Sequence, residues 1–176
     1  MQEESFFYFH DMGNDTSYSI VPFTIADKEA YKQIRLESLR KEPAVFGSNY
    51  AREAAFEEAE WDNRLLNPDA ASFGLYHGDT LIGTTGILTI EPGIALLIAS
   101  YIRAAYRGKG LSALLYEARI AGAKAKGIKS IIVSHRKSNT ASRAANQHFH
   151  FRYTHEEMTT WPDGQQEENV FYRLEL

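Results

Sequence analysis

The stretch that decides the fold is residues 101–115, which read YIRAAYRGKGLSALL. An apolar strand, Ile94–Ile102, leads into it, and leucines and alanines at helical spacing follow it as far as Ala125. Between them, two glycines at 108 and 110 allow the backbone to approach a bulky anion closely. The first turn of a helix also offers unpaired N–H groups and the positive end of its dipole. This stretch therefore predicts a phosphate-binding loop.

The motifs around the glycines narrow the kind of anion. The P-loop pattern GxxxxGK[ST] is absent. Residues 108–113 do satisfy the loose dinucleotide pattern G-x-G-x-x-[GA], which keeps a dinucleotide-binding oxidoreductase as an alternative. However, residues 103–107 separate the strand from the first glycine, and the preceding segments read as antiparallel hairpins rather than strand–helix–strand units. The oxidoreductase is therefore the less favoured interpretation.

Working outward, periodicity and turn residues predict one mixed α/β domain over residues 18–176, preceded by an N-terminal extension, residues 1–17. Strands are expected at 18–23, 72–77, 81–90, 94–102, 128–134, 151–158 and 170–176. Helices are expected at 27–41, 52–66, 111–125 and 139–149. We expect a central, largely antiparallel sheet of about six to seven strands, flanked by about four helices.

Composition excludes several classes of protein. With 176 residues, of which 44% are hydrophobic and 12% aromatic, the chain is a folded domain rather than a disordered one. The lack of cysteine excludes disulfides, thiolate metal sites and a cysteine nucleophile, and the histidines show no metal-ligand spacing, so we expect no metal site. No apolar run could span a membrane, and the N-terminus lacks the basic start of a secretory signal. We expect a cytoplasmic protein with no membrane partner.

The charge is unevenly distributed. Between Arg103 and Lys137, nine basic residues and one acid, Glu117, give +8, which leaves −12 for the rest of a chain whose net charge is −4. A basic segment set in an acidic protein indicates a seat for a small polyanion. The acidic remainder would repel a nucleic acid, so we expect no nucleic-acid partner.

Two motifs give the chain a resemblance to the GNAT superfamily of N-acetyltransferases. Arg107-Gly108-Lys109-Gly110-Leu111-Ser112 is similar to the family signature [QR]-x-x-G-x-[GA], with Ser112 in place of the last Gly or Ala. Asn139-Thr140-Ala141-Ser142 resembles the N-x-x-[AS] start of a later helix, and His150-Phe151 stands where Gly-Phe is usual. The order of predicted elements also matches over residues 18–176. The resemblance implies the GNAT fold and acetyl-CoA as co-substrate.

The same resemblance implies a place for each part of the coenzyme. Backbone N–H groups from Arg107 to Ser112 would hold the pyrophosphate. The strand end from Tyr101 to Arg103 would pair with the pantetheine arm, and the N–H of Ile102 would polarise the thioester carbonyl. Asn139 would contact the arm from the other side.

The catalytic groups are less clear. Asn146 stands at the coenzyme position where the family often has a tyrosine that acts as general acid on the leaving thiolate, and an amide cannot do this. Residues 94–100 carry no carboxylate that could act as a base, which leaves His135, after the next strand, as the candidate base. These departures keep a non-catalytic acyl-CoA-binding protein as an alternative.

The resemblance implies transfer of an acetyl group to an amine of a small molecule or peptide, by direct attack and without a covalent enzyme intermediate. A homodimer is compatible with the sequence. An acidic acceptor site, and hence a cationic amine, is suggested by six glutamates of the first two predicted helices and the segment between them: Glu37, Glu42, Glu53, Glu57, Glu58 and Glu60.

Overall fold

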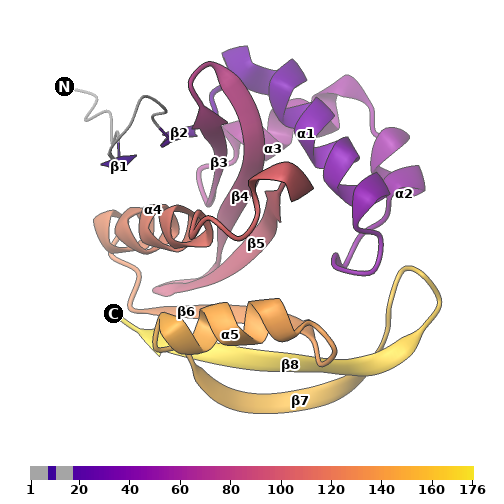
Figure 1. Cartoon of the computed structure of the whole chain (residues 1–176), viewed down its shortest axis with the longest axis vertical. Coiled ribbons are helices and arrows are strands. Elements are labelled where there is room, and N and C mark those ends of the chain that lie inside the picture. The colour runs from indigo at the N-terminus through magenta and orange to yellow at the C-terminus, as the bar shows by residue number, and fades with distance from the viewer. Residues whose placement is uncertain (1–7, 11–17) are drawn as a thin grey trace.

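One sheet organises the protein, as the computed structural model of residues 8–10 and 18–176 shows (Figure 1). Its strands lie in the order β1-β2-β3-β4-β5-β6-β8-β7. Their bounds are β1 Tyr8–His10, β2 Tyr18–Pro22, β3 Ala70–His77, β4 Thr80–Glu91, β5 Ile94–Ile102, β6 Ser130–Arg136, β7 Arg152–Thr160 and β8 Gln166–Glu175. The helices are α1 Lys28–Lys41, α2 Tyr50–Ala54, α3 Glu58–Leu66, α4 Ser112–Ala125 and α5 Thr140–His148, with single 3-10 turns at Ile25–Asp27 and Ala104–Tyr106.

The mixed α/β architecture and the largely antiparallel sheet are confirmed, with two differences in detail. The helix expected at 52–66 is two helices, because Asn49 caps α2 and Glu57 starts α3 in a capping box with Glu60. An additional strand, β1, falls within the segment 1–17 that was expected to be an extension, and the rest of that segment lies outside the described residues.

Helices cover both faces of the sheet. Tyr101 of β5 packs in a cluster with Ile34 of α1 and Trp61 of α3. The next residue, Ile102, packs against the cluster of α4 that contains Leu115. Because successive side chains of a strand point to opposite faces, α1 and α3 lie on one face and α4 on the other. Within residues 8–10 and 18–176, no helix is long and apolar enough to cross a membrane.

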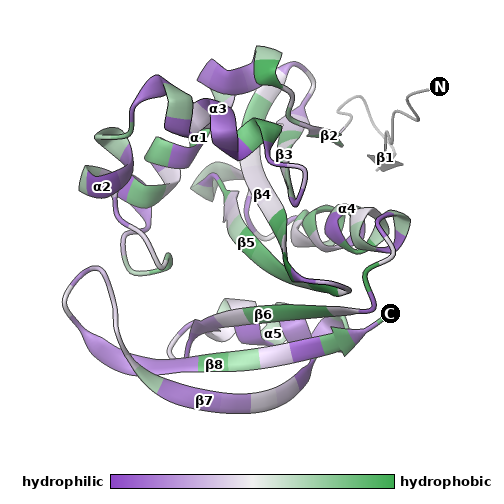
Figure 2. Cartoon of the chain, turned by 180° about the vertical axis from the view of Figure 1, so that it is seen from behind, coloured by the Kyte–Doolittle hydropathy of each residue, from purple (hydrophilic) through white to green (hydrophobic). Residues whose placement is uncertain are grey.

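The C-terminal strands form a separate wing of the sheet. Apolar residues of β6 and β8 pack with α4 and α5 in a third cluster that includes Tyr116, Ile131 and Phe151. β7 forms the sheet edge, and Figure 2 shows it as largely hydrophilic while β6 is largely hydrophobic. This wing joins the rest of the sheet only through β6.

The junction between the two wings is short. β5 pairs with β4 along its whole length, but it pairs with β6, in parallel, only through Ile94–Leu96 and Ser130–Ile132. Beyond Leu96 the two strands diverge (Figure 1). The remaining edge of β5, residues 97–102, is therefore left without a partner strand among the described residues, and it leads directly into the glycine loop.

A buried ion pair fixes α2 and α3 against α1. Glu53 of α2 accepts two hydrogen bonds from Arg35 of α1, at 2.9 and 2.7 Å, and its Oε2 lies 3.1 Å from a guanidinium nitrogen of Arg64 of α3. Glu53 and Arg35 are both buried. Removing one member of such a group leaves an uncompensated buried charge.

We therefore expect Glu53→Ala to lower the free energy of unfolding by about 3–5 kcal/mol, measured by urea denaturation. The matched control is Glu58→Ala, which removes an exposed carboxylate paired with Lys28 and Lys32 and should barely change stability. Equal effects of the two substitutions would show that the buried group is not a major source of stability.

The same group makes stability depend on pH. Burial by itself would raise the pKa of the Glu53 carboxyl, but the hydrogen bonds and charges of Arg35 and Arg64 outweigh it and hold that pKa below its ordinary value of 4.5. The unfolded chain then binds the proton more readily, so this stabilisation is complete above the ordinary pKa and is lost as the pH falls below it. Glu53→Gln should flatten the fall in unfolding free energy between about pH 5 and pH 3 relative to the unsubstituted protein, and parallel curves would contradict this.

Candidate functional site

The glycine loop has the backbone shape that the sequence predicts. Gly108 and Gly110 have φ angles of 75° and 76°, which side-chain-bearing residues rarely adopt. A Cβ built at either position would meet no atom within 4 Å, so the space above the loop is open. The loop ends at Ser112, the first residue of α4.

The loop presents free N–H groups at the start of α4. The N–H of Arg107 donates to the carbonyl of Ala104, so it is not available to a ligand, contrary to the expectation for that residue. The N–H groups of residues 108–112 have no acceptor within the described part of the chain. Together with the dipole of α4, these N–H groups form a site that fits a phosphate group.

The two cations of the loop, Arg107 and Lys109, differ in whether other residues of the protein already bind them. Arg107 is turned back toward the strand: its Nε donates to the carbonyl of Ile102 at 2.8 Å, and its Nη2 lies 2.7 Å from a carboxylate oxygen of Glu42 at the end of α1. Lys109 is exposed and lies near the ring of Tyr106, with Nζ 5.3 Å from the ring centroid. Lys109 is thus the loop cation that is ready for an anion, whereas Arg107 would first have to release Glu42.

The unpaired edge of β5 continues from the loop. The N–H of Arg103 donates to the carbonyl of Ile82 in β4, so alternation along the strand turns the backbone groups of Ile102 to the other, open edge, where its carbonyl accepts from Arg107. A bulge intervenes at this point, because Ala99 and Ser100 together face Thr85 of β4 and Ala99 has a φ of 56°. The edge therefore offers N–H donors to an extended ligand.

On the face of the sheet that α1 covers, the end of β5 is hydrogen-bonded to Glu37 of α1. Glu37 accepts hydrogen bonds from Arg103 at 2.9 and 2.7 Å and from the hydroxyl of Tyr101 at 3.0 Å. The hydrogen bond from Arg103 lowers the pKa of the Glu37 carboxyl, while burial and the hydrogen bond to Glu37 raise the pKa of Tyr101 to about 12. Glu37 therefore stays ionised and paired, which makes it a poor proton acceptor.

The ion pairs correct the expectation of an acidic acceptor site. Glu37 and Glu42 pair with Arg103 and Arg107 of the basic segment. Glu53 is buried among arginines, and Glu58 pairs with two lysines. Four of the six glutamates are thus neutralised by cations of this chain. They do not form the acidic surface that favoured a cationic amine.

His135 differs from its expected setting. It lies within β6, not after it, is 4% exposed, and stacks on Tyr172 of β8. Its Nδ1 lies 2.7 Å from the carbonyl of Arg136, an acceptor, so Nδ1 carries the proton and Nε2 the lone pair. Burial lowers the pKa of His135 and keeps it neutral. These contacts hold His135 against Arg136 and β8, and none of them brings it to Ile102.

The two predicted asparagines have structural partners. Asn139 is the N-cap of α5, where its Oδ1 accepts from the N–H of Ser142 at 3.0 Å. Asn146 is fully buried, and its Oδ1 accepts from the hydroxyl of Tyr116 at 2.6 Å. The Nδ2 of Asn146 has no hydrogen-bond partner among the described residues. Asn146 thus belongs to the contact between α4 and α5.

The sequence patterns do not point to Ser100 and Arg119, which form a hydrogen bond on the α4 side of β5. Ser100 is exposed in the bulge, and Arg119 of α4 donates to its hydroxyl at 2.7 Å. A signal was present, because Arg119 follows Leu115 by four residues and therefore stands on the apolar face of α4. A charged residue on such a face is rarely buried unless it has a partner.

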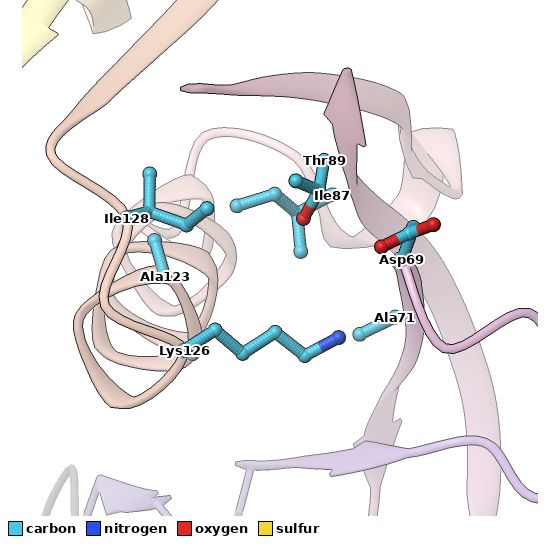
Figure 3. A pocket seen from close by; sticks show the side chains of 8 residues that line it. Asp69, Ala71, Ile87, Thr89, Ala123, Lys126 and Ile128 are labelled. Carbon is cyan, nitrogen blue, oxygen red and sulfur yellow. The ribbon is translucent and has the colours of Figure 1, made fainter. Parts of the chain in front are cut away.

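A small cavity elsewhere is unrelated to this site. It has a volume of about 20 Å³ and lies between the C-terminal end of α4 and strands β3 and β4, at the far end of the helix from the glycine loop (Figure 3). Lys126 extends across it toward Asp69 and Ala71, and its Nζ donates to the carbonyl of Pro68 at 2.8 Å. The cavity has room for about one water molecule and none for a coenzyme.

Comparison with known proteins agrees with this geometry. The sequence matches the Acetyltransferase (GNAT) family over residues 32–151, which is more than half of the chain. A search of curated proteins finds no match. The matched region contains most of α1, the glycine loop and both asparagines.

Similar solved structures share the whole fold. An N-acetyltransferase from Staphylococcus aureus Mu50 is 21% identical, with a TM-score of 0.70 over 90% of this chain and 98% of that chain. The protein yncA from Salmonella typhimurium, solved with its cofactor acetyl-CoA, is 18% identical, with a TM-score of 0.72 over 90% and 94%. The ribosomal-protein-S18-alanine N-acetyltransferase from Escherichia coli is 17% identical, with a TM-score of 0.67 over 90% and 93%.

The glycine loop opens a single β–α–β crossover from β5 through α4 to β6, but strands β2 to β5 before it are antiparallel, unlike the successive β–α–β units of a dinucleotide-binding domain. The sequence match instead agrees with the open edge of β5 and the loop that follows it. The chain belongs to the GNAT acetyltransferase family, which uses acetyl-CoA as the acetyl donor.

Proposed function

We propose that this protein transfers the acetyl group of acetyl-CoA to an amine of a small molecule or peptide by direct attack of the amine on the thioester. The observation that carries the proposal is the continuous path from the open edge of β5 into the glycine loop. A ligand whose extended arm is joined to a pyrophosphate matches both halves of this path.

Each part of the coenzyme has a partner in this proposal. The N–H groups of residues 108–112 and the ammonium of Lys109 bind the pyrophosphate. The arm pairs with β5 from Arg103 to Tyr101 as an added strand, and the N–H of Ile102 donates to the thioester carbonyl. The free Nδ2 of Asn139 reaches the arm from α5.

The proposed chemistry places few demands on proton transfer. Neither Glu37, which is ionised and paired, nor His135, which is buried in β6, is positioned as a base. The amine must then arrive neutral, which favours amines such as α-amino groups, with a pKa of about 7.7–8.0, over lysine-like amines near 10.4. The leaving thiol, with a pKa of about 8.5, departs as a thiolate without a strong acid.

Coenzyme A should stabilise the folded protein, because it binds only the native state. At a ligand concentration about 100-fold above the dissociation constant, the gain is about 2.7 kcal/mol, seen as a rise in melting temperature. Gly110→Asp should abolish the rise, since a carboxylate in the loop repels the pyrophosphate. The matched control is Gly127→Asp, at the other end of α4, which also has a positive φ and open space around it. An unchanged coenzyme response in a folded Gly110→Asp variant would refute the assignment of the loop.

The turnover experiment separates the proposed enzyme from a non-catalytic acyl-CoA-binding protein. Acetyl-CoA is mixed with a panel of small amines and short peptides, and free thiol is measured against time. We expect thiol release that requires the amine and rises with pH as the amine loses its proton. If acetyl-CoA binds but no amine accelerates thiol release, the non-catalytic alternative, which the replacement of the family tyrosine by Asn146 favours, is correct.

A further inference from the structure

Arg119 is a buried cation without a counterion. It is 1% exposed, and its recorded hydrogen bonds are to neutral groups: Nε donates to the carbonyl of Leu115 at 2.9 Å and Nη1 to the hydroxyl of Ser100 at 2.7 Å. The guanidinium carbon lies 4.6 Å from the centroid of the Tyr116 ring. Among the described residues, no carboxylate lies within ion-pair distance of Arg119, and its Nη2 has no hydrogen-bond partner.

Such an arrangement is costly. A buried charge is normally paired, and replacing it with an apolar side chain is often neutral or stabilising. Burial lowers the pKa of Arg119 to about 10, yet the group is still charged at neutral pH. The fold therefore keeps a positive charge in its interior, although an apolar side chain at this position would avoid the cost of burying that charge.

The Nδ2 of Asn146 is a second buried donor. Tyr116 connects the two, because its ring contacts Arg119 and its hydroxyl donates to Asn146 at 2.6 Å. Neither this Nδ2 nor the Nη2 of Arg119 has an acceptor in the part of the chain that the structure describes. Two buried donors that lack acceptors, one of them charged, call for a group that only accepts hydrogen bonds and carries negative charge. An ionised carboxylate has both properties.

The open edge of β5 gives this cluster its access to ligand. Ser100, the hydrogen-bond partner of Arg119, is exposed in the bulge within the unpaired stretch. Its hydroxyl also lies 2.9 Å from that of Thr85. When Thr85 donates, Ser100 accepts from both Thr85 and Arg119, and its own proton is free to point outward. Ser100 is thus both a donor and the entry to the guanidinium behind it.

The position along β5 indicates which part of a ligand reaches the cluster. In the proposed binding mode the coenzyme enters at the loop, runs from Arg103 toward Tyr101, and presents its carbonyl at Ile102. Ser100 lies two residues farther along the strand, roughly 7 Å away. The group that extends past the carbonyl is the acyl chain.

We propose that the Arg119 cluster, formed by Ser100, Tyr116, Arg119 and Asn146, binds the distal carboxylate of a dicarboxylic acyl group on coenzyme A, so that the enzyme accepts acyl donors of the succinyl class in addition to acetyl-CoA. The inference rests on the proposed binding mode. The reaction is the same in kind: the amine nitrogen forms a bond to the thioester carbon, the carbon–sulfur bond breaks with its electron pair on sulfur, and the amine proton passes to solvent. The product is an amide that carries a free carboxylate.

The test compares binding of three donors to the full chain by calorimetry: acetyl-CoA, succinyl-CoA and butyryl-CoA, whose acyl chain has the length of succinyl without its carboxylate. We expect succinyl-CoA to bind about 10- to 100-fold more tightly than butyryl-CoA, because its carboxylate gains charge-assisted hydrogen bonds. Equal affinity of these two donors would overturn the inference.

Variants assign the preference to the cluster. Arg119→Met should remove the preference for succinyl-CoA over butyryl-CoA, whatever its effect on the affinity of both donors, and Arg119→Lys should retain part of that preference because it keeps the charge without the planar fork. Ser100→Ala, at an exposed site that tolerates substitution, should weaken the preference and covers the case in which Arg119→Met does not fold. The control is Thr84→Val, because the buried hydroxyl of Thr84 has no hydrogen-bond partner within residues 8–10 and 18–176. A preference that survives both Arg119→Met and Ser100→Ala would locate the carboxylate elsewhere.

Two further arms separate the possible outcomes. Free succinate added with coenzyme A should not reproduce the affinity of succinyl-CoA, and if it does, the cluster is a general carboxylate site rather than an acyl site and the inference is wrong. Because every arm measures binding, the result is independent of turnover. A protein that prefers succinyl-CoA but releases no thiol with amines would support the acyl site and refute the proposed transferase activity.

Discussion

The rest of the structure depends on the short pairing between β5 and β6. β5 and β6 pair over only three residues on each strand, Ile94–Leu96 with Ser130–Ile132, and then diverge. An unpaired strand edge exposes backbone donors and acceptors that would normally be paired or covered. Here the exposed edge leads into a glycine loop at the start of α4, so the same break in the sheet creates both a strand-like binding surface and a phosphate site.

Keeping this edge open requires firm support on both sides. On one face, Glu37 ties Tyr101 and Arg103 to α1, and on the other face Arg119 reaches the bulge from α4. The strain of a positive φ at Ala99 is held between these contacts. The charges of the basic segment are thus largely used within the protein, and Lys109 is the cation that the loop presents outward.

The sequence predicts the fold more completely than it predicts the arrangement of the site. The helical period after Gly110 and the strand run 94–102 have strong local signals, and both elements lie where they were expected. The division of the segment 52–66 was missed because capping by Glu57 interrupts a pattern that is otherwise helical throughout. At the site, the glycine φ angles follow from the motif. The engagement of Arg107 with Glu42 joins residues 65 positions apart and has no local signature. His135 was misplaced because two additional residues belong to β6, which changes its surroundings from loop to core.

The central claim is that coenzyme A occupies the unpaired edge of β5 and the loop that follows it. Amide hydrogen exchange with and without coenzyme A tests this claim directly, because it reads the backbone N–H groups themselves. We predict slower exchange at Ile102 and at residues 108–112 when coenzyme A is bound, and no change at Leu96, which already pairs with β6. Slowed exchange confined to other parts of the sheet, with Ile102 and the loop unaffected, would contradict the account.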